Sequence, residues 1–572
     1  MISAPPPEPL LPAAADIRPL AALRANLRRI DGWGDLAWKE ILGAWRLSAG
    51  TLLLTLPEFE VDQQDDERLA FVLINHALGS THPVATADWL LREAWATLLN
   101  TPAIQAWTLR PGAAVRATNA CWFADGQVVL RLHLTLPYAG MCIDARRFAR
   151  FVRQVEAFAS AIATPCARPT LRAQRRSVAR QQALRTVLPA HGLVAFLAEG
   201  AVLPRAADGG PAPSATPLHV PAQLATTIDL GRLGRVRGWG ITSGVTALAG
   251  APYHGKSTVL QALQAGIADR PPGDGREGVV AIDSALLVQA EDGRPIKNQD
   301  LSGFFRTLPG ADARHFSTAR ASGATSMAAS VLQGLAGGCR LLLIDEDSAA
   351  SNFLLIDPVM RALLGRTLDG VQTLLEALPI FAAMGISTVL VAGSTGHSLA
   401  VAKRIVQLDH WQPHDVTRRV RRLVPLLRAG SSGNDESAIQ RVVTRGLADS
   451  PDAIFGPRHF APLDLREPER PRIKLPAPNG INGWHTLDLR RCGWQLDEAL
   501  VAGALFAAGW VCRLAAGGAT LAQLQPAYEH LVADGGALAL DPFHSRLLAV
   551  PPWQLVVTVL ERLPVPLLSS GR

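Results

Sequence analysis

The sequence predicts an α/β protein with a mainly parallel central sheet, flanked by an N-terminal α+β domain and a small C-terminal α/β domain. Between residues 220 and 430, short apolar runs alternate with helical segments, as expected of strands buried on both faces of a parallel sheet. The 572 residues suffice for about four domains. With 48% hydrophobic and 18% charged residues, the chain is neither disordered nor a coiled coil.

The N-terminal part begins with a proline-rich stretch. We expect residues 1–19 to be a disordered leader, because they contain six prolines and no basic residue before Arg18, which fits neither a signal peptide nor a transit peptide. The α+β domain follows over residues 20–190. Within it, the alternating run 127–136 predicts a half-buried strand. Residues 191–219 are expected to form a strand pair, over 193–204, and a linker.

Arginine is concentrated at the end of the N-terminal domain. The chain has only five lysines among 56 basic residues, and residues 145–188 hold ten arginines against one acid, Glu156. Because guanidinium groups bind phosphates bidentately, this run predicts a nucleic-acid contact, largely independent of sequence. The candidate contacts are Arg168, Arg172, Arg175, Arg176 and Arg180. A coding bias that leaves solvated, arginine-rich helix faces is the alternative.

The apolar runs of the central part define its expected strands. They are 245–249, 279–282, 341–344, 388–392 and 405–408. An α/β core is thus expected over 220–430, a linker over 431–469, and the C-terminal domain over 470–572. The longest apolar run, 499–512, has 14 residues, fewer than the ~18 to 20 that span a bilayer. With six scattered cysteines and no CxxC pair, we expect a cytoplasmic protein without a membrane partner.

The strongest motif is GAPYHGKS at 250–257, which fits G-x-x-x-x-G-K-[ST] between an expected strand and the apolar helix 258–267. In this loop, backbone N–H groups and the helix start bind the phosphates of ATP, Lys256 reaches the β- and γ-phosphates, and Ser257 ligates Mg²⁺. The candidate nucleotide-binding residues are Gly250, Ala251, Pro252, Tyr253, His254, Gly255, Lys256, Ser257 and Thr258.

A buried strand that ends in acids, LLLIDED at 341–347, lies downstream of the loop. It is the pattern of a Walker B element. We expect Asp345 to hold the metal and Glu346 to be the catalytic residue that orients and polarises the attacking water, with Lys256 stabilising the transferred phosphoryl group.

A Ser-Gly pair opens an expected helix at 325–335, which Gly337 and Gly338 can end. Ser322 lies 23 residues before Asp345, and Gly323 follows it directly. The segment ASGATSM at 321–327 resembles the signature motif of ABC ATPases. That resemblance implies contact with the γ-phosphate held by a facing protomer, and it puts Asn352 at the dimer seam. An ordinary capped helix is the alternative.

Together these segments resemble the predicted ABC-class ATPases, a family of soluble P-loop proteins of bacteria and some eukaryotes. The likeness covers roughly residues 23–417 and includes LRRIDGWG at 27–34. Its other segments are VT at 245–246, YHGKST at 253–258, PGDGRE at 272–277, AEDGR at 290–294, FST at 316–318, ASG at 321–323 and IDED at 344–347. The resemblance implies ATP binding and hydrolysis. A family member associated with mitochondrial RNA editing in trypanosomes implies RNA binding.

Two elements of ABC ATPases lack a clear counterpart. Alignment puts Ser394 at the switch-histidine position, with His397 three residues later. Gln289, Gln299 and Glu291 are the candidates for the Q-loop residue.

The sequence thus predicts an ATPase that uses ATP and Mg²⁺, closes as a nucleotide-sandwich homodimer and clamps nucleic acid, RNA rather than DNA. A second arginine cluster, at 418–428, supports this hypothesis. An ATPase that remodels a protein partner, without a nucleic-acid ligand, is the alternative.

Overall fold

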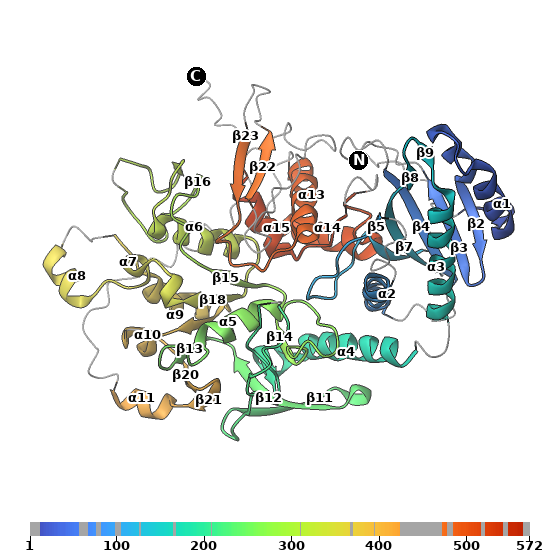
Figure 1. Ribbon diagram of the computed structural model, residues 1–572. Coiled ribbons are helices and arrows are strands. Elements are labelled where there is room, and N and C mark those ends of the chain that lie inside the picture. Colours follow the sequence, from blue (N-terminus) through green and yellow to red (C-terminus); the bar gives the residue numbers. More distant parts are fainter. Residues whose placement is uncertain are drawn as a thin grey trace. The chain divides into compact units, whose positions relative to one another are not determined.

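The computed structural model describes most of the chain (Figure 1). The described residues are 12–55, 67–75, 82–97, 105–124, 127–163, 168–207, 209–308, 310–365, 370–393, 395–423, 472–476, 484–515, 521–541 and 547–563. The expected linker at 431–469 lies outside them. The chain forms two compact units, one of residues 1–179 and 531–550, the other of 180–530 and 551–572.

The first unit is built on a seven-stranded sheet in the order β1-β2-β3-β4-β7-β5, with β6 also paired to β7. Its elements are η1 (Ala14–Asp16), β1 (Arg18–Pro19), α1 (Leu20–Ile30), η2 (Asp35–Ile41), β2 (Gly43–Leu47), β3 (Gly50–Thr55), β4 (Glu67–Asn75), α2 (Pro83–Thr97), β5 (Gln105–Trp107), β6 (Cys121–Ala124), β7 (Gln127–Thr135), β8 (Tyr138–Ala139), β9 (Cys142–Ile143), α3 (Ala145–Ala163) and the first part of α4 (Arg168–Val187). Helices α1, α2 and α3 contribute to its apolar core. The last residues of the expected disordered leader are ordered, because Arg18 and Pro19 form β1, which pairs with β2 in parallel.

The prediction of a half-buried strand at 127–136 was wrong in its burial, because β7 is buried along both faces. Its even-numbered positions 128–134 lie in the core with the helices. The opposite face holds Arg131 and His133, which are 0% and 3% exposed. Burial lowers the pKa of Arg131 to about 10, against the opposing charge of the buried Asp541. This acid comes from the distant segment 531–550, so no local pattern could reveal that the second face is covered.

The second unit contains a six-stranded sheet in the order β15-β18-β19-β13-β20-β21, parallel except for β21. These strands are β15 (Ala285–Val288), β18 (Leu341–Asp345), β19 (Ser387–Val391), β13 (Val245–Ala249), β20 (Arg404–Asp409) and β21 (Gln412–Asp415). The apolar runs alternate between two cores: Leu341 and Leu343 face α5 (Lys256–Ala265), whereas Leu342 and Ile344 lie in the cluster of α6 (Gly323–Ala336) and α9 (Leu374–Ala383). The expected parallel sheet is therefore confirmed.

Helix α5 also packs against a second, antiparallel sheet in the order β11-β12-β10-β14. Its strands are β10 (Leu193–Ala198), β11 (Ala225–Asp229), β12 (Arg235–Thr242) and β14 (Val279–Ala281). Two predictions were wrong here. The run 279–282 pairs antiparallel with β10 instead of joining the parallel sheet, whose edge is taken by β15. After the turn at Gly200, residues 201–204 form no second strand.

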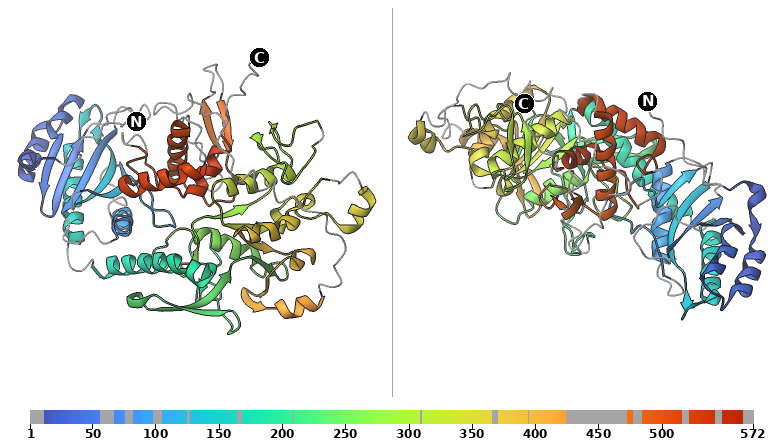
Figure 2. Two further views of the ribbon diagram at one scale, coloured as in Figure 1. Left: turned by 180° about the vertical axis from the view of Figure 1, so that it is seen from behind. Right: turned by 90° about the horizontal axis from the view of Figure 1, so that it is seen from above.

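The expected C-terminal domain is divided between the two units. Helix α15 (Trp553–Leu560) packs against α6 and α13 (Glu498–Ala515), and Trp553 Nε1 donates to Gly337 O at 3.0 Å. In Figure 2 the red C-terminal helices lie next to the yellow-green segment that contains α6. The remaining elements of this unit are η4 (Pro189–His191), η5 (Gly231–Leu233), β16 (Ile296–Gln299), β17 (Phe316–Thr318), η6 (Glu346–Ser348), α7 (Ser351–Leu354), α8 (Pro358–Leu364), α10 (His397–Ala400), α11 (Thr417–Leu423), β22 (Arg472–Pro476), β23 (Trp484–Asp488) and most of α14 (Leu521–Gly535).

Candidate nucleotide site

The glycine-rich loop follows β13 directly and leads into α5, as its motif predicts. Gly250 has φ +146°, and a Cβ there would lie 2.4 Å from the carbonyl oxygen of Leu408 on β20. Gly255 has φ +95°, and its missing Cβ would meet the ring of Trp411 at 2.2 Å. Both positions therefore require glycine, because a side chain would collide with the neighbouring strand or turn.

Lys256 is the first residue of α5 and is buried, with 7% of its surface exposed. Its Nζ donates to the carbonyl oxygens of Gly250 at 2.7 Å and of Ala251 at 3.0 Å. The ammonium is thus held inside the loop, at the N-terminal end of α5, where the helix dipole favours an anion.

The two acids of the Walker B pattern lie at the end of β18. Asp345 is 8% exposed, and its Oδ1 accepts from the backbone N of Asp347 at 3.2 Å. Glu346 follows, and its Oε2 accepts from the backbone N of Gly393 at 2.7 Å. Strands β13, β18 and β19 are parallel, so the loop, the acids and Gly393 all follow carboxyl ends at one edge of the sheet. Ligands of open α/β sheets bind at this edge.

The contact between Gly393 and Glu346 was missed by the sequence reasoning. The position of Gly393, two residues after β19, was the available signal. Ser394, the residue aligned with the switch histidine, lies outside the described residues, and His397 begins α10.

The residues of the expected signature cap α6. Ser322 is the N-cap, and its hydroxyl accepts from the backbone N of Thr325 at 3.3 Å. Ser322 is exposed. Gly323 lies close to the segment that follows the Walker B acids, since a Cβ at position 323 would be 3.5 Å from Cβ of Ala350. The helix ends at Ala336 with Gly337 as C-cap, as expected. Helix capping and a signature role both fit this geometry.

The three Q-loop candidates have different surroundings. Gln289 directly follows β15. Gln299 ends β16, where its Nε2 donates to the carbonyl oxygen of Asp300 at 3.3 Å. Glu291 is 6% exposed and forms a bidentate ion pair with Arg562 of the C-terminal segment, with Nε to Oε2 at 3.0 Å.

That ion pair belongs to a buried polar network beside α6. Arg294 donates to Oε1 of Gln333 at 2.8 Å, and Gln333 Nε2 donates to Glu561 at 2.9 Å. Burial, and then the nearby Arg562, lower the pKa of Arg294 to about 9. Burial lowers the pKa of Arg562, but the charge and hydrogen bonds of Glu291, together with the nearby Cys492 and Glu561, raise it overall. The network thus ties the C-terminal segment to α6 and to the segment after β15.

The arginine run forms the helices α3 and α4. In α3 the arginines are exposed, opposite a buried apolar face that includes Phe148, Phe151 and Val155. The five candidates of α4 differ from one another: Arg172 and Arg176 are exposed, and the side chain of Arg168 lies outside the described residues.

The remaining two arginines are engaged within the protein. Arg175 Nε donates to Oγ1 of Thr86 at 2.7 Å, and Arg180 donates to the carbonyl oxygen of Arg235 at 3.0 Å. The structure therefore leaves Arg172 and Arg176 facing solvent as the nucleic-acid candidates of α4.

Among the described residues, no helix combines the length and the apolar character needed to cross a membrane. Residues 167–445 match the family model of the ABC_ATPase P-loop domain. A relative among curated proteins is the uncharacterized protein MJ1628 of Methanocaldococcus jannaschii, 30% identical over 220 residues. The match covers 36% of this chain and 47% of that protein, so the chain spans about half the length of this relative.

Two solved structures are similar over part of the chain. The first is cbiO1 of Clostridium perfringens, part of the ABC transporter complex cbiONQ, with 15% identity, a TM-score of 0.24, and coverage of 41% of this chain and 95% of that one. The second is a chain from the inward-facing conformation of an ABC transporter described as of the metal-chelate type, with 16% identity, a TM-score of 0.23, and coverage of 34% and 81%.

Proposed function

We propose that the chain binds ATP with Mg²⁺ and hydrolyses the nucleotide at the carboxyl edge of the six-stranded sheet, since residues 167–445 match the model of the ABC_ATPase P-loop domain. The observation that carries the proposal is the convergence of Lys256, Asp345 and Glu346 on one edge, from the ends of two parallel strands. Phosphoryl transfer mainly requires such positioning and charge compensation.

Each residue has a distinct role in this proposal. Phosphate oxygens of ATP replace the loop carbonyl oxygens as hydrogen-bond partners of the Lys256 ammonium. Backbone N–H groups at the start of α5 bind the phosphates as well. The hydroxyl of Ser257 and the carboxylate of Asp345 suit Mg²⁺, which prefers oxygen ligands and neutralises phosphate charge when bound. Glu346, held by the N–H of Gly393, orients the attacking water and accepts its proton.

The test of this function is the variant Glu346→Gln. Without the base, we expect turnover to fall by about 10²–10⁴-fold, while ATP binding persists because the loop is unchanged. Phosphate release and nucleotide titration measure the two quantities. Asp283→Asn, which removes an exposed acid of the same unit, is the control and should leave both unchanged. Wild-type turnover in Glu346→Gln would refute this choice of base.

A nucleotide-sandwich homodimer is the second part of the proposal. Ser322 and Asn352 are both exposed, which leaves them available to a facing protomer, and Gly323 lies close to Ala350. Slow hydrolysis should trap the closed state, so the mass of Glu346→Gln in solution should double when ATP is added. A protein that stays monomeric at saturating ATP would exclude the dimer.

Nucleic acid, RNA rather than DNA, is the proposed substrate of the clamp. Support comes from the exposed Arg172 and Arg176 of α4, from the exposed arginines of α3, and from those of α11. Phosphate contacts release counterions, so affinity for a structured RNA should fall linearly on a log–log plot against salt. Binding that is absent, or flat across the salt series, would reject this substrate.

A protein partner is the alternative substrate. It is favoured by the amphipathic α3, whose arginines occupy the face that any solvated helix exposes, and by the internal hydrogen bonds of Arg175 and Arg180. Identification of what co-purifies with Glu346→Gln from its own cells separates the two alternatives, because a trapped clamp retains its substrate.

A further inference from the structure

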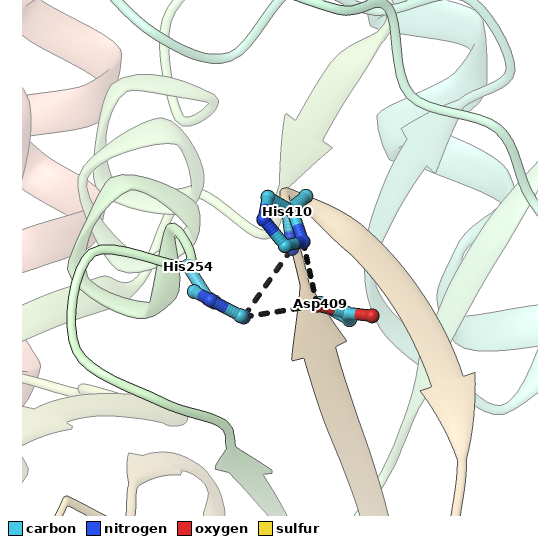
Figure 3. A group of neighbouring side chains, drawn as sticks. All are labelled: His254, Asp409 and His410. Carbon is cyan, nitrogen blue, oxygen red and sulfur yellow. Dashed lines mark hydrogen bonds and ion pairs between the residues drawn. The ribbon is translucent and has the colours of Figure 1, made fainter.

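A group of metal-ligating side chains lies at the P-loop edge and has no part in the proposed hydrolysis. His254 is in the P-loop, Asp409 ends β20, and His410 begins the turn to β21 (Figure 3). Because β20 pairs in parallel with β13, both strands end at the same edge, which brings the three residues together.

The three side chains converge on one carboxylate oxygen. Oδ1 of Asp409 lies 3.1 Å from Nδ1 of His254 and 2.7 Å from Nδ1 of His410. One ligand atom from each residue falls within 4.8 Å of the others, and the imidazole rings are 4.5 Å apart. Ligands of a tetrahedral ion with bonds of about 2.05 Å stand about 3.3 Å apart, so small side-chain rotations suffice to bind one.

The hydrogen bonds of His254 favour a cation at this point. Its Nδ1 accepts from the backbone N of His410 at 3.4 Å and also faces the Asp409 oxygen at 3.1 Å. An unprotonated imidazole nitrogen and a carboxylate oxygen are both electron-pair donors, so a cation placed between them is a shared partner for the two atoms.

We propose that His254, Asp409 and His410 form a binding site for a divalent transition metal ion of the zinc class, which fastens the P-loop to the β20–β21 turn. Two imidazoles and a carboxylate suit such ions, whereas Mg²⁺ prefers a shell of oxygen ligands, so this site is separate from that of the nucleotide metal. Access is open, since the side chains of Asp409 and His410 are 51% and 77% exposed.

The turn already contacts the loop at a second point, because the ring of Trp411 occupies the space beside Gly255. His254 lies two residues before Lys256. An ion bound to His254 and His410 therefore restricts the segment that carries the phosphate-binding lysine.

The site is tested with the untagged full chain, free of nucleotide and Mg²⁺, so that failure here would leave the proposed ATPase untouched. Titration with Zn²⁺ should show one saturable ion per chain, and Co²⁺ should give the visible absorption of a tetrahedral site. His410→Ala and Asp409→Asn should each weaken Zn²⁺ binding at least about tenfold, the cost that even outer-shell changes reach. His414→Ala, an exposed histidine of the same hairpin, should bind like the wild type.

Hydrogen exchange tests the fastening. Zn²⁺ should slow amide exchange in residues 250–257 and 409–412 of the wild type and of His414→Ala, but not of His410→Ala. Thermal unfolding in a chelator establishes that each variant is folded, and Asp409→Asn replaces His410→Ala if the latter is not. Absence of saturable binding, equal binding by all variants, or exchange unaffected by zinc would overturn the proposal.

Discussion

The carboxyl edge of the six-stranded sheet and the arginine helices of the first unit are both rich in charge, but they hold it differently. At the sheet edge, Lys256 and Asp345 are buried. The ammonium of Lys256 donates to a backbone carbonyl oxygen of the loop, and the carboxylate of Asp345 accepts from a backbone N–H. On α3, by contrast, arginines project to solvent from the back of an apolar face. A charge that is enclosed by its fold has a defined task, whereas an exposed charge only becomes specific when a partner is present.

Removal of enclosed charges should have large effects, and removal of exposed arginines should have small ones. Four experiments test the contrast.

The largest effect is expected for Arg562→Met. The change leaves the Glu291 carboxylate buried without its bidentate partner, which should lower the free energy of unfolding by about 3–5 kcal/mol. Denaturant unfolding measures it. The double variant Glu291→Gln, Arg562→Met is the control, since removal of both charges should recover much of the loss. A double variant as unstable as the single one would show that the pairing is not the cause.

Lys256→Ala should reduce ATP turnover by about 10²–10³-fold, equivalent to about 2.7–4 kcal/mol, because the ammonium that compensates phosphate charge is lost. Steady-state hydrolysis and nucleotide titration measure this change. Lys403→Ala, at an exposed lysine of the same unit, is the matched control and should behave as the wild type. Equal losses in both variants would contradict a specific role for Lys256.

His133 is a buried titratable residue of the first unit, which also carries the exposed arginines. A change at His133 therefore shows whether burial, and not the unit in which a residue lies, decides how much its removal changes stability. Burial, and then the charge of Arg131, lower its pKa to about 3, against about 6.5 in the unfolded chain. The folded form therefore excludes a proton that the unfolded chain takes up. The stability associated with neutral His133 is complete above pH 6.5 and is lost at about 1.4 kcal/mol per pH unit as the pH falls towards 3.

Denaturant unfolding at pH 7 and pH 5 measures this loss, which should be about 2 kcal/mol smaller in His133→Gln than in the wild type. His82→Asn removes an exposed histidine at φ +58°, a conformation that asparagine tolerates, and should keep the wild-type pH dependence. An unchanged slope in His133→Gln would mean that other groups account for acid unfolding.

The smallest effect is expected for the double variant Arg172→Ala, Arg176→Ala. If both side chains contact phosphates, the slope of log affinity against log salt should decrease in magnitude by about 2, since each contact contributes about 0.9. Fluorescence anisotropy with a labelled RNA measures the slope. Arg110→Ala, an exposed arginine of the same unit outside the run, should leave it unchanged. An unaltered slope in the double variant would remove α4 from the interface.

The local geometry of the candidate nucleotide site could be predicted because its motifs are local. A strand, a glycine-rich turn and a helix are consecutive in the sequence, and β18 carries its acids at its own end, so each fragment reveals its role without its neighbours. The contact of Gly393 with Glu346 could not be found in this way, because it depends on β19 lying beside β18 in the sheet.

The sequence by itself determined which short apolar runs are buried strands, that a glycine-rich loop joins one of them to a helix, and that carboxylates end another, since apolar patterning and turn chemistry act over a few residues. Only the tertiary structure decided that β15 and not β14 completes the parallel sheet, that Glu291 is paired with Arg562, and that both faces of β7 are covered. In each case two segments far apart in the sequence compete for one surface. Burial of apolar area and pairing of enclosed charges decide that competition, and neither is a property of a single segment.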